Sequence, residues 1–177
     1  MLSNTKLIFL IGFMGTGKSA VGKLLAKKAG FVFVDLDKLI EKEEGLKIPV
    51  IFEQYGEAYF RDLEKKAILS LKTMHKAVVA TGGGAVLDPL NMTAMKEAGL
   101  VIALDANLET LWKRLKSSTN RPLLNASNPK NRIKELYNAR RPFYIQAHHI
   151  VDTSGKTVND VAQEILNLYI SDKNIFD

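Results

Sequence analysis

The stretch Gly12-Phe13-Met14-Gly15-Thr16-Gly17-Lys18-Ser19 decides the fold of this chain. It fits the pattern G-x-x-x-x-G-K-[ST], a glycine-rich turn that cradles phosphate groups between a strand and a helix. The flanks agree, because the apolar run Leu7–Ile11 precedes it and helically spaced apolar residues follow it. The N–H groups of the turn and the positive end of the helix can face an anion. The stretch therefore predicts a nucleotide-binding P-loop.

Two residues of this loop have specific chemical roles. Lys18 can reach the β and γ phosphates of a nucleotide, and the Ser19 hydroxyl can ligate Mg²⁺. The alternative is a plain glycine turn between strand and helix. The strand pattern before the loop and the helix pattern after it argue against that alternative.

Short apolar runs alternate with helical patterns along the rest of the chain. Strands are expected at residues 6–11, 31–35, 77–81, 100–105 and 149–152. Helices are expected at 18–29, 37–44, 48–55, 57–74, 91–98, 108–115, 131–146 and 158–170. This alternation predicts an α/β fold of three layers, with right-handed βαβ units and helices on both faces of a parallel sheet. Such sheets bind ligands at the carboxyl ends of their strands, so the residues that follow each strand are the functional candidates.

Composition limits the classes of protein to which this chain can belong. The length of 177 residues suits one domain, and 46% hydrophobic with 25% charged residues is typical of soluble globular proteins. The absence of cysteine excludes disulfides and thiolate metal sites. We expect a cytoplasmic protein with no membrane segment, because no leader precedes the first strand and no apolar run could span a bilayer.

The formal net charge of +6 has two explanations. One is nucleic-acid binding, and the other is a solvated surface with a site for anionic substrates. Basic residues stand in short clusters such as Lys27-Lys28 and Lys65-Lys66, with acids nearby and no interleaved aromatic residues. The pattern therefore favours anionic small molecules over nucleic acid as partners.

Two carboxylates follow the second expected strand. Asp35 and Asp37 are two residues apart, so in an extended segment they point the same way. Such a pair can hold Mg²⁺ or orient a hydroxyl group. The alternative is that Asp37 only caps the helix that follows.

Three glycines, Gly82, Gly83 and Gly84, follow the third expected strand. Many P-loop proteins carry an acidic Mg²⁺ ligand here, and this chain has none. Consecutive glycines let a ligand approach the backbone closely, whereas the alternative is a flexible turn.

Several arginines are candidates for binding a carboxylate or a phosphate. Arg61 lies near the start of a long expected helix, Arg121 precedes a Pro-Leu-Leu stretch, and Arg140 and Arg141 precede Pro142. The guanidinium group is a planar fork that matches these anions, but surface ion pairs, such as Arg61 with Glu64, explain each of them equally well. The polar segment 116–130, which contains Arg121, has the length of a mobile lid or of an ordinary surface loop.

Taken together, the motifs resemble those of shikimate kinases over nearly the whole chain. The resemblance rests on the P-loop, Asp35-Leu36-Asp37, the stretch 56–64 with Phe60-Arg61 and Glu64, Gly82–Gly84, Arg121-Pro122-Leu123-Leu124 and Arg140-Arg141-Pro142-Phe143-Tyr144. It implies a P-loop kinase fold like that of nucleoside monophosphate kinases, with a five-stranded parallel sheet in the order 2-3-1-4-5. It also implies one domain over residues 1–177, with a substrate-binding region at about 36–64 and a lid at about 114–127.

The resemblance also assigns roles to individual residues. It implies catalytic roles for Asp37, Lys18 and Arg121. Its nucleotide-binding set is Gly12, Met14, Gly15, Thr16, Gly17, Lys18, Ser19, Ala20, Arg114 and Arg121, with Arg114 packed on adenine. Its shikimate contacts are Asp37, Arg61, Gly82, Gly83, Gly84 and Arg140, and its Mg²⁺ ligands are Ser19 and Asp35. One departure is that the proline often found beside the adenine is missing near Val158.

The implied reaction is transfer of a phosphoryl group from ATP to the 3-hydroxyl of shikimate, with Mg²⁺, in the pathway to chorismate and the aromatic amino acids. We expect ATP and shikimate as partners and a monomeric enzyme. Another hydroxy-acid kinase of the same fold, such as gluconate kinase, is the nearest alternative. A nucleotide-dependent switch and a nucleic-acid-binding protein are the others, and the paired arginines with Asp37 argue against a switch.

Overall fold

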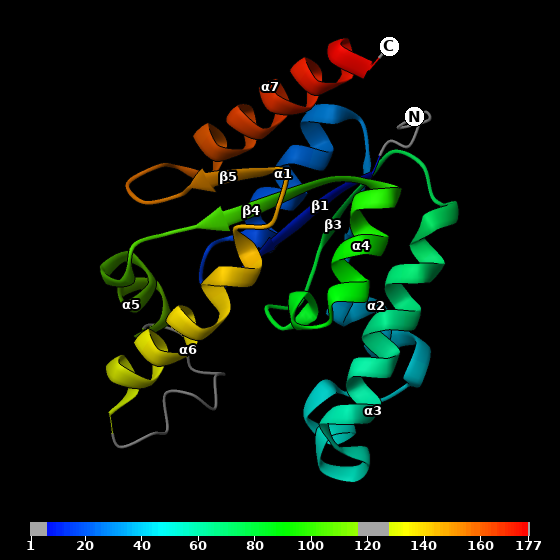
Figure 1. Cartoon of the computed structure of the whole chain (residues 1–177), viewed down its shortest axis with the longest axis vertical. Coiled ribbons are helices and arrows are strands. Elements are labelled where there is room, and N and C mark those ends of the chain that lie inside the picture. The colour runs from blue at the N-terminus through cyan, green and yellow to red at the C-terminus, as the bar shows by residue number, and fades with distance from the viewer. Residues whose placement is uncertain (1–6, 117–127, 177) are drawn as a thin grey trace.

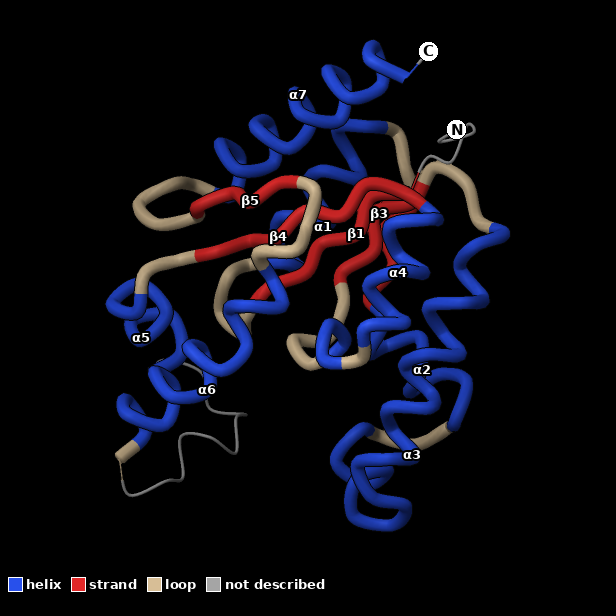
Figure 2. Tube along the Cα trace, in the orientation of Figure 1, coloured by secondary structure: helices blue, strands red, loops and turns tan. Residues whose placement is uncertain are grey.

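The strand β1 (Leu7–Gly12) occupies the centre of the sheet, and all six of its residues are buried. The structure is a computed structural model that describes residues 7–116 and 128–176, with side chains up to residue 172. The other strands are β2 (Val32–Asp35), β3 (Ala77–Ala80), β4 (Gly99–Asp105) and β5 (His149–Asp152). Every neighbouring pair is parallel, in the order β2-β3-β1-β4-β5. The strands form a single sheet through the middle of the molecule (Figure 2). The predicted fold class and strand order are confirmed.

Helices cover both faces of the sheet (Figure 1). They are α1 (Lys18–Ala29), α2 (Leu36–Glu44), α3 (Ile48–Ser70), α4 (Pro89–Ala98), α5 (Leu108–Lys116), α6 (Pro129–Tyr144) and α7 (Val158–Phe176), with short 3₁₀ turns η1 (Leu71–Thr73) and η2 (Ala85–Leu87). The helices α1 and α7 pack on one face, and α2 to α6 pack on the other. None of the described helices is long and apolar enough to cross a membrane.

The alternation of side chains along β1 builds two cores. Leu7, Phe9 and Ile11 pack into the core under α2 to α6, whereas Ile8 and Leu10 pack into the core under α1 and α7. All five are fully buried, and each such side chain contributes about 1.5–3 kcal/mol on burial. The P-loop is therefore anchored to a fully buried strand at the centre of the sheet.

Several helices differ from their predicted bounds: α4 begins at Pro89 and not at 91, and α7 continues to Phe176 where an end at 170 was expected. Two further differences have local reasons. The helices expected at 48–55 and 57–74 form one element, α3, with a kink at Gly56, where φ is 81° and ψ is 174°. The helix expected at 131–146 is α6, which begins earlier because Asn128 caps it and accepts from Asn131 N. Pro142 lies inside the last turn of α6.

Candidate active site

The P-loop joins β1 to α1 as the sequence predicts. Gly12, Gly15 and Gly17 all have positive φ angles, which lets the turn close without a Cβ in the way. The Thr16 hydroxyl donates to Phe13 O at 2.8 Å and fixes the loop from within. Lys18 Nζ donates to Gly12 O at 2.7 Å and to Phe13 O at 3.0 Å. The ammonium group is therefore held over the loop, where a phosphate would meet it.

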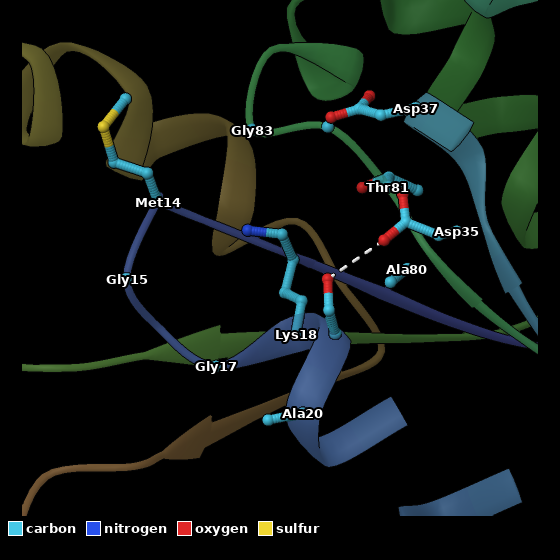
Figure 3. A pocket seen from close by; sticks show the side chains of 12 residues that line it. Met14, Gly15, Gly17, Lys18, Ala20, Asp35, Asp37, Ala80, Thr81 and Gly83 are labelled. Carbon is cyan, nitrogen blue, oxygen red and sulfur yellow. Dashed lines mark hydrogen bonds between the residues drawn. The ribbon is translucent and has the colours of Figure 1, made fainter. Parts of the chain in front are cut away.

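A cavity of about 310 Å³ lies in front of this loop, and Figure 3 shows side chains entering it from the ends of neighbouring strands. Its lining consists of Met14, Gly15, Gly17, Lys18, Ser19, Ala20, Asp35, Asp37, Ala80, Thr81, Gly82 and Gly83. The strand ends β1, β2 and β3 thus form one pocket, as expected for a parallel sheet.

Ser19 and Asp35 meet inside this pocket. Ser19 Oγ donates to Asp35 Oδ2 at 3.2 Å, and Asp35 Oδ1 accepts from Lys38 N at 3.4 Å (Figure 3). Asp35, and not Asp37, therefore caps α2. A hydroxyl and one carboxylate suit Mg²⁺, which takes few protein oxygens and completes its shell with water and phosphate. No group of three or more His, Cys, Asp or Glu residues that could hold a metal occurs among the described residues.

Asp37 lies in the first turn of α2 and points into the pocket (Figure 3). Its Oδ1 atom is buried and has no hydrogen-bond partner. Burial raises the pKa of the carboxyl group, Asp35 raises it further, and Lys18 opposes both. A desolvated acceptor without a partner is costly, so a ligand that donates a hydrogen bond to Asp37 would relieve that cost.

The glycines after β3 leave room for charged side chains. A Cβ at Gly82 would lie 2.9 Å from Asp37 Oδ1 and 3.0 Å from Glu64 Oε1. A Cβ at Gly84 would lie 2.6 Å from both terminal nitrogens of Arg61. The carboxylates of Asp37 and Glu64 therefore converge on the Gly82 backbone, and the Arg61 guanidinium lies against Gly84.

Glu64 is the site residue whose role the sequence did not reveal, apart from its expected pairing with Arg61. The side chain is fully buried, and its Oε2 accepts from Arg61 Nη1 at 2.7 Å. Its Oε1 has no partner. Burial raises the pKa of Glu64 to about 6, although Arg61 pulls it down. Glu57 also accepts from Arg61, at 3.0 Å, so two carboxylates fix the guanidinium.

Arg140 approaches the glycine loop from α6. A Cβ at Gly83 would lie 3.7 Å from both Arg140 Nη1 and Tyr144 Oη. Tyr144 Oη donates to Gly83 O at 2.6 Å and ties α6 to the glycine loop. Burial raises the pKa of Tyr144 to about 12, against the opposing charge of Arg140. Tyr144 is a second residue whose role was missed, because its partner is distant in the sequence.

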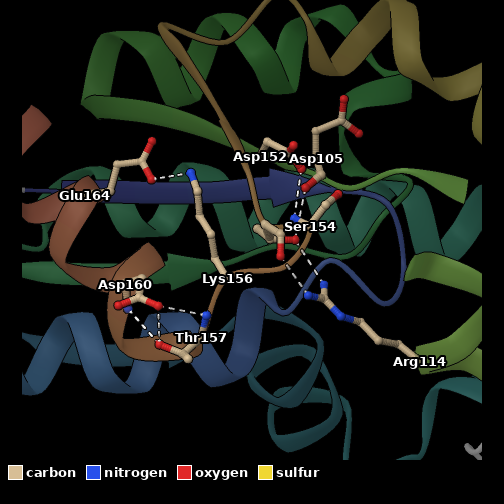
Figure 4. Close-up of polar contacts among 9 residues, drawn as sticks. Asp105, Arg114, Asp152, Ser154, Lys156, Thr157, Asp160 and Glu164 are labelled. Atoms are coloured by element: carbon tan, nitrogen blue, oxygen red, sulfur yellow. Dashed lines mark hydrogen bonds and ion pairs between the residues drawn. The ribbon is translucent and has the colours of Figure 1, made fainter. Parts of the chain in front are cut away.

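Arg114, expected to pack on adenine, bridges the P-loop and the loop after β5. Its Nη1 donates to Gly15 O at 3.2 Å and to Thr153 Oγ1 at 3.0 Å, and its Nη2 donates to Thr153 O at 2.9 Å. The loop is fixed further by Ser154 N donating to Asp152 Oδ1 at 2.9 Å (Figure 4). Arg114 therefore lies beside the P-loop, and adenine packing stays a prediction. Arg121 and most of the expected lid lie outside the described residues.

Replacing Gly84 with alanine tests the fit between the glycine loop and Arg61. The new Cβ would displace a guanidinium that Glu57 and Glu64 hold, so we expect KM for the acceptor substrate to rise at least about tenfold. KM for the nucleotide should change little, whereas the melting temperature should fall, because the clash also disturbs the pairing of Arg61 with the buried Glu64. Steady-state kinetics and thermal melts check this. An unchanged acceptor KM would show that Arg61 does not act from its place against Gly84.

Comparison with known proteins agrees with this geometry. A family model described as "Shikimate kinase" matches residues 14–169. The chain belongs to the shikimate kinase family. It is 49% identical to the shikimate kinase of Thermodesulfovibrio yellowstonii over 164 residues, which cover 93% of this chain and 95% of the relative. It is 52% identical to that of Persephonella marina over 159 residues, 90% of this chain and 96% of the relative.

A solved structure of a family member is also closely similar. Shikimate kinase from Acinetobacter baumannii, in complex with shikimate, superposes with a TM-score of 0.88 at 38% identity, covering 97% of each chain. The shikimate kinase from Aquifex aeolicus matches with a TM-score of 0.80 at 37% identity, over 96% of this chain and 98% of that one. The predicted family is therefore confirmed.

Proposed function

We propose that this chain transfers a phosphoryl group from ATP to the 3-hydroxyl of shikimate and releases 3-phosphoshikimate and ADP. Membership of the shikimate kinase family supports this reaction, in the pathway to chorismate and the aromatic amino acids. The observation that carries it in this chain is the convergence of Asp37, Glu64 and Arg61 on Gly82–Gly84 beside the P-loop. A kinase for an uncharged alcohol has no use for such a guanidinium.

The acceptor would be held at both ends. Arg61 and Arg140 bind its carboxylate, and the guanidinium fork allows two parallel hydrogen bonds. Asp37 accepts a hydrogen bond from the attacking hydroxyl through its partnerless Oδ1 atom. The phosphoryl transition state is loose, so alignment of the hydroxyl contributes as much as removal of its proton. The raised pKa of Asp37 brings it nearer to that of an effective base.

The nucleotide would lie on the P-loop. Lys18 exchanges its bonds to the Gly12 and Phe13 carbonyls for bonds to phosphate oxygens and stabilises the transferring group. Ser19 would hold Mg²⁺ directly, and Asp35 directly or through water. When bound, the ion neutralises charge on the phosphates. Gly12, Met14, Gly15, Thr16, Gly17 and Ala20 complete the nucleotide contacts, with Arg114 at the adenine.

We further propose that residues 1–177 work as one domain with two movable parts. The acceptor-binding region spans about 36–64, and a lid spans about 114–127 with Arg121 as a second phosphate contact. Closure of the lid over both ligands would keep water away from the transferring group.

Turnover with shikimate tests the proposal directly. ADP release is measured with ATP, Mg²⁺ and a panel that includes shikimate, gluconate and other hydroxy acids. We expect turnover with shikimate, and product phosphorylated at the 3-position, identified by nuclear magnetic resonance. Turnover of gluconate in place of shikimate would contradict the proposal and favour the other kinase of this fold.

A further inference from the structure

The net positive charge of the chain comes from two helices, α5 and α6. Together α5 and α6 contain eight basic and two acidic residues, a net charge of +6 that equals the formal charge of the whole chain. The basic residues are Lys113, Arg114, Lys116, Lys130, Arg132, Lys134, Arg140 and Arg141. The rest of the sequence therefore sums to zero. Six of these eight side chains are exposed, whereas Arg114 and Arg140 are half-buried. We call the surface of α5 and α6 that the six exposed side chains form the cationic wall.

The opposite side of the ligand-binding edge has the reverse charge. The helices α2 and α3 contain five basic and eight acidic residues, a net charge of −3. Figure 1 shows α5 and α6 on one side of this edge and α2 and α3 on the other. The pocket thus lies between walls of opposite sign, and the resulting field points an approaching anion toward α5 and α6.

The cationic wall adjoins the nucleotide side of the pocket. Leu115 of α5 would lie 3.1 Å from a Cβ at Gly15, and Arg114 Nη1 donates to the Gly15 carbonyl. On α6, the ring of Tyr137 packs edge-on against Phe13 of the P-loop, with centroids 5.7 Å apart. An anion attracted to this wall arrives beside the P-loop.

Helix stability accounts for some of these charges but not for Lys130. Lys113, Arg114 and Lys116 lie in the last turn of α5 and Arg141 lies in the last turn of α6, where a cation suits the helix dipole. The first turns of α2, α5 and α7 contain the acids Asp37, Glu109 and Asp160, which suit the positive end of a helix. The first turn of α6, like those of α1, α3 and α4, contains no acid, and it carries Lys130. A cation at this end opposes the helix dipole, so stability alone would favour an acid there.

We propose that the cationic wall steers the nucleotide, drawing the polyphosphate of ATP toward the P-loop and raising its association rate. The proposal rests on the proposed function, which supplies the polyanionic ligand. Steering acts over about one Debye length and weakens with salt. It requires charge near the path of the nucleotide, and it requires no contact with the bound nucleotide.

The double variant Lys130→Gln, Lys134→Gln tests this proposal, because both side chains are exposed and neither belongs to the proposed binding machinery. Stopped-flow fluorescence with N-methylanthraniloyl-ATP and Mg²⁺ measures association and dissociation separately. At an ionic strength of about 20 mM we expect the association rate constant to fall about three- to tenfold. The dissociation rate constant should change little, the melting temperature should stay equal or rise, and the difference should vanish at about 0.5 M salt.

The matched control removes the same charge at the other edge of the sheet. In Lys27→Gln, Lys76→Gln both positions are exposed, one in the last turn of α1 and one just before β3. The control should keep the native association rate. An equal fall in the control, or no fall in the Lys130 and Lys134 variant, would overturn the proposal. So would duplex DNA binding that depends on these two lysines while nucleotide association stays unchanged. Normal nucleotide association without turnover of shikimate would refute the proposed function and leave the steering result standing.

Discussion

Asp37→Asn is expected to lower kcat by about a thousandfold while ATP still binds. The substitution keeps the shape of the side chain and removes the negative charge that orients and activates the attacking hydroxyl. Asp37 lines the pocket beside the P-loop, yet the contacts of Lys18 and Ser19 do not depend on it. Steady-state kinetics with both substrates, and titration with a fluorescent ATP analogue, measure the two effects separately.

The same variant should be at least as stable as the native protein. The Asp37 carboxylate is desolvated, is repelled by Asp35 and Glu41, and has a buried oxygen without a partner. Removing the charge removes the desolvation of the carboxylate and the repulsion, while a buried polar atom without a partner remains, so the melting temperature should stay equal or rise as activity falls. Asp62→Asn, at an exposed carboxylate of α3, serves as control and should keep full activity. A near-native kcat in Asp37→Asn would contradict the assignment of Asp37 as the residue that orients or deprotonates the hydroxyl.

The parts of this site that could be predicted depend on residues that lie close together in the sequence. The P-loop needs one short pattern, and its strand and helix are its direct neighbours. Asp35 and Asp37 could be placed because the strand ends of a parallel sheet meet at one edge. Since that rule depends on topology alone, small errors in strand bounds did not affect it.

The parts that could not be predicted depend on packing between distant segments. Glu64 could be expected to pair with Arg61 one helical turn away, but its full burial beside Gly82 follows from how α3 lies against the end of β3. Tyr144 bonds to Gly83, which is 61 positions away. No periodicity in the sequence links these partners.

The triple glycine was expected to let a ligand approach the backbone closely, and the structure adds a second reason for these glycines. Two carboxylates and one guanidinium occupy the space where side chains at Gly82 and Gly84 would lie. Contact of these glycines with a ligand stays a prediction. The sequence pattern could not reveal the crowding, because the crowding groups come from α2 and α3.

Arg61→Ala is expected to raise KM for shikimate about a hundredfold and to destabilise the protein above neutral pH. The first effect follows from loss of the proposed hydrogen bonds between Arg61 and the carboxylate of shikimate. The second arises because Arg61 is the partner of the fully buried Glu64. Arg140→Ala should weaken shikimate binding as Arg61→Ala does, but its loss of stability should be much smaller than that of Arg61→Ala. Both variants should keep their affinity for ATP, which titration measures.

The sign of the pH effect in Arg61→Ala follows from Glu64. Its pKa is about 6, above the ordinary 4.5, and loss of Arg61 raises it further. A carboxyl with a raised pKa costs stability when ionised, so the penalty is absent below pH 4.5 and complete above the folded pKa. The melting temperature of Arg61→Ala should therefore fall furthest below the native value near pH 8 and approach it near pH 5. Adding Glu64→Gln should restore stability at pH 8 without restoring shikimate binding. A loss of stability that did not vary with pH would refute this account of the buried pair.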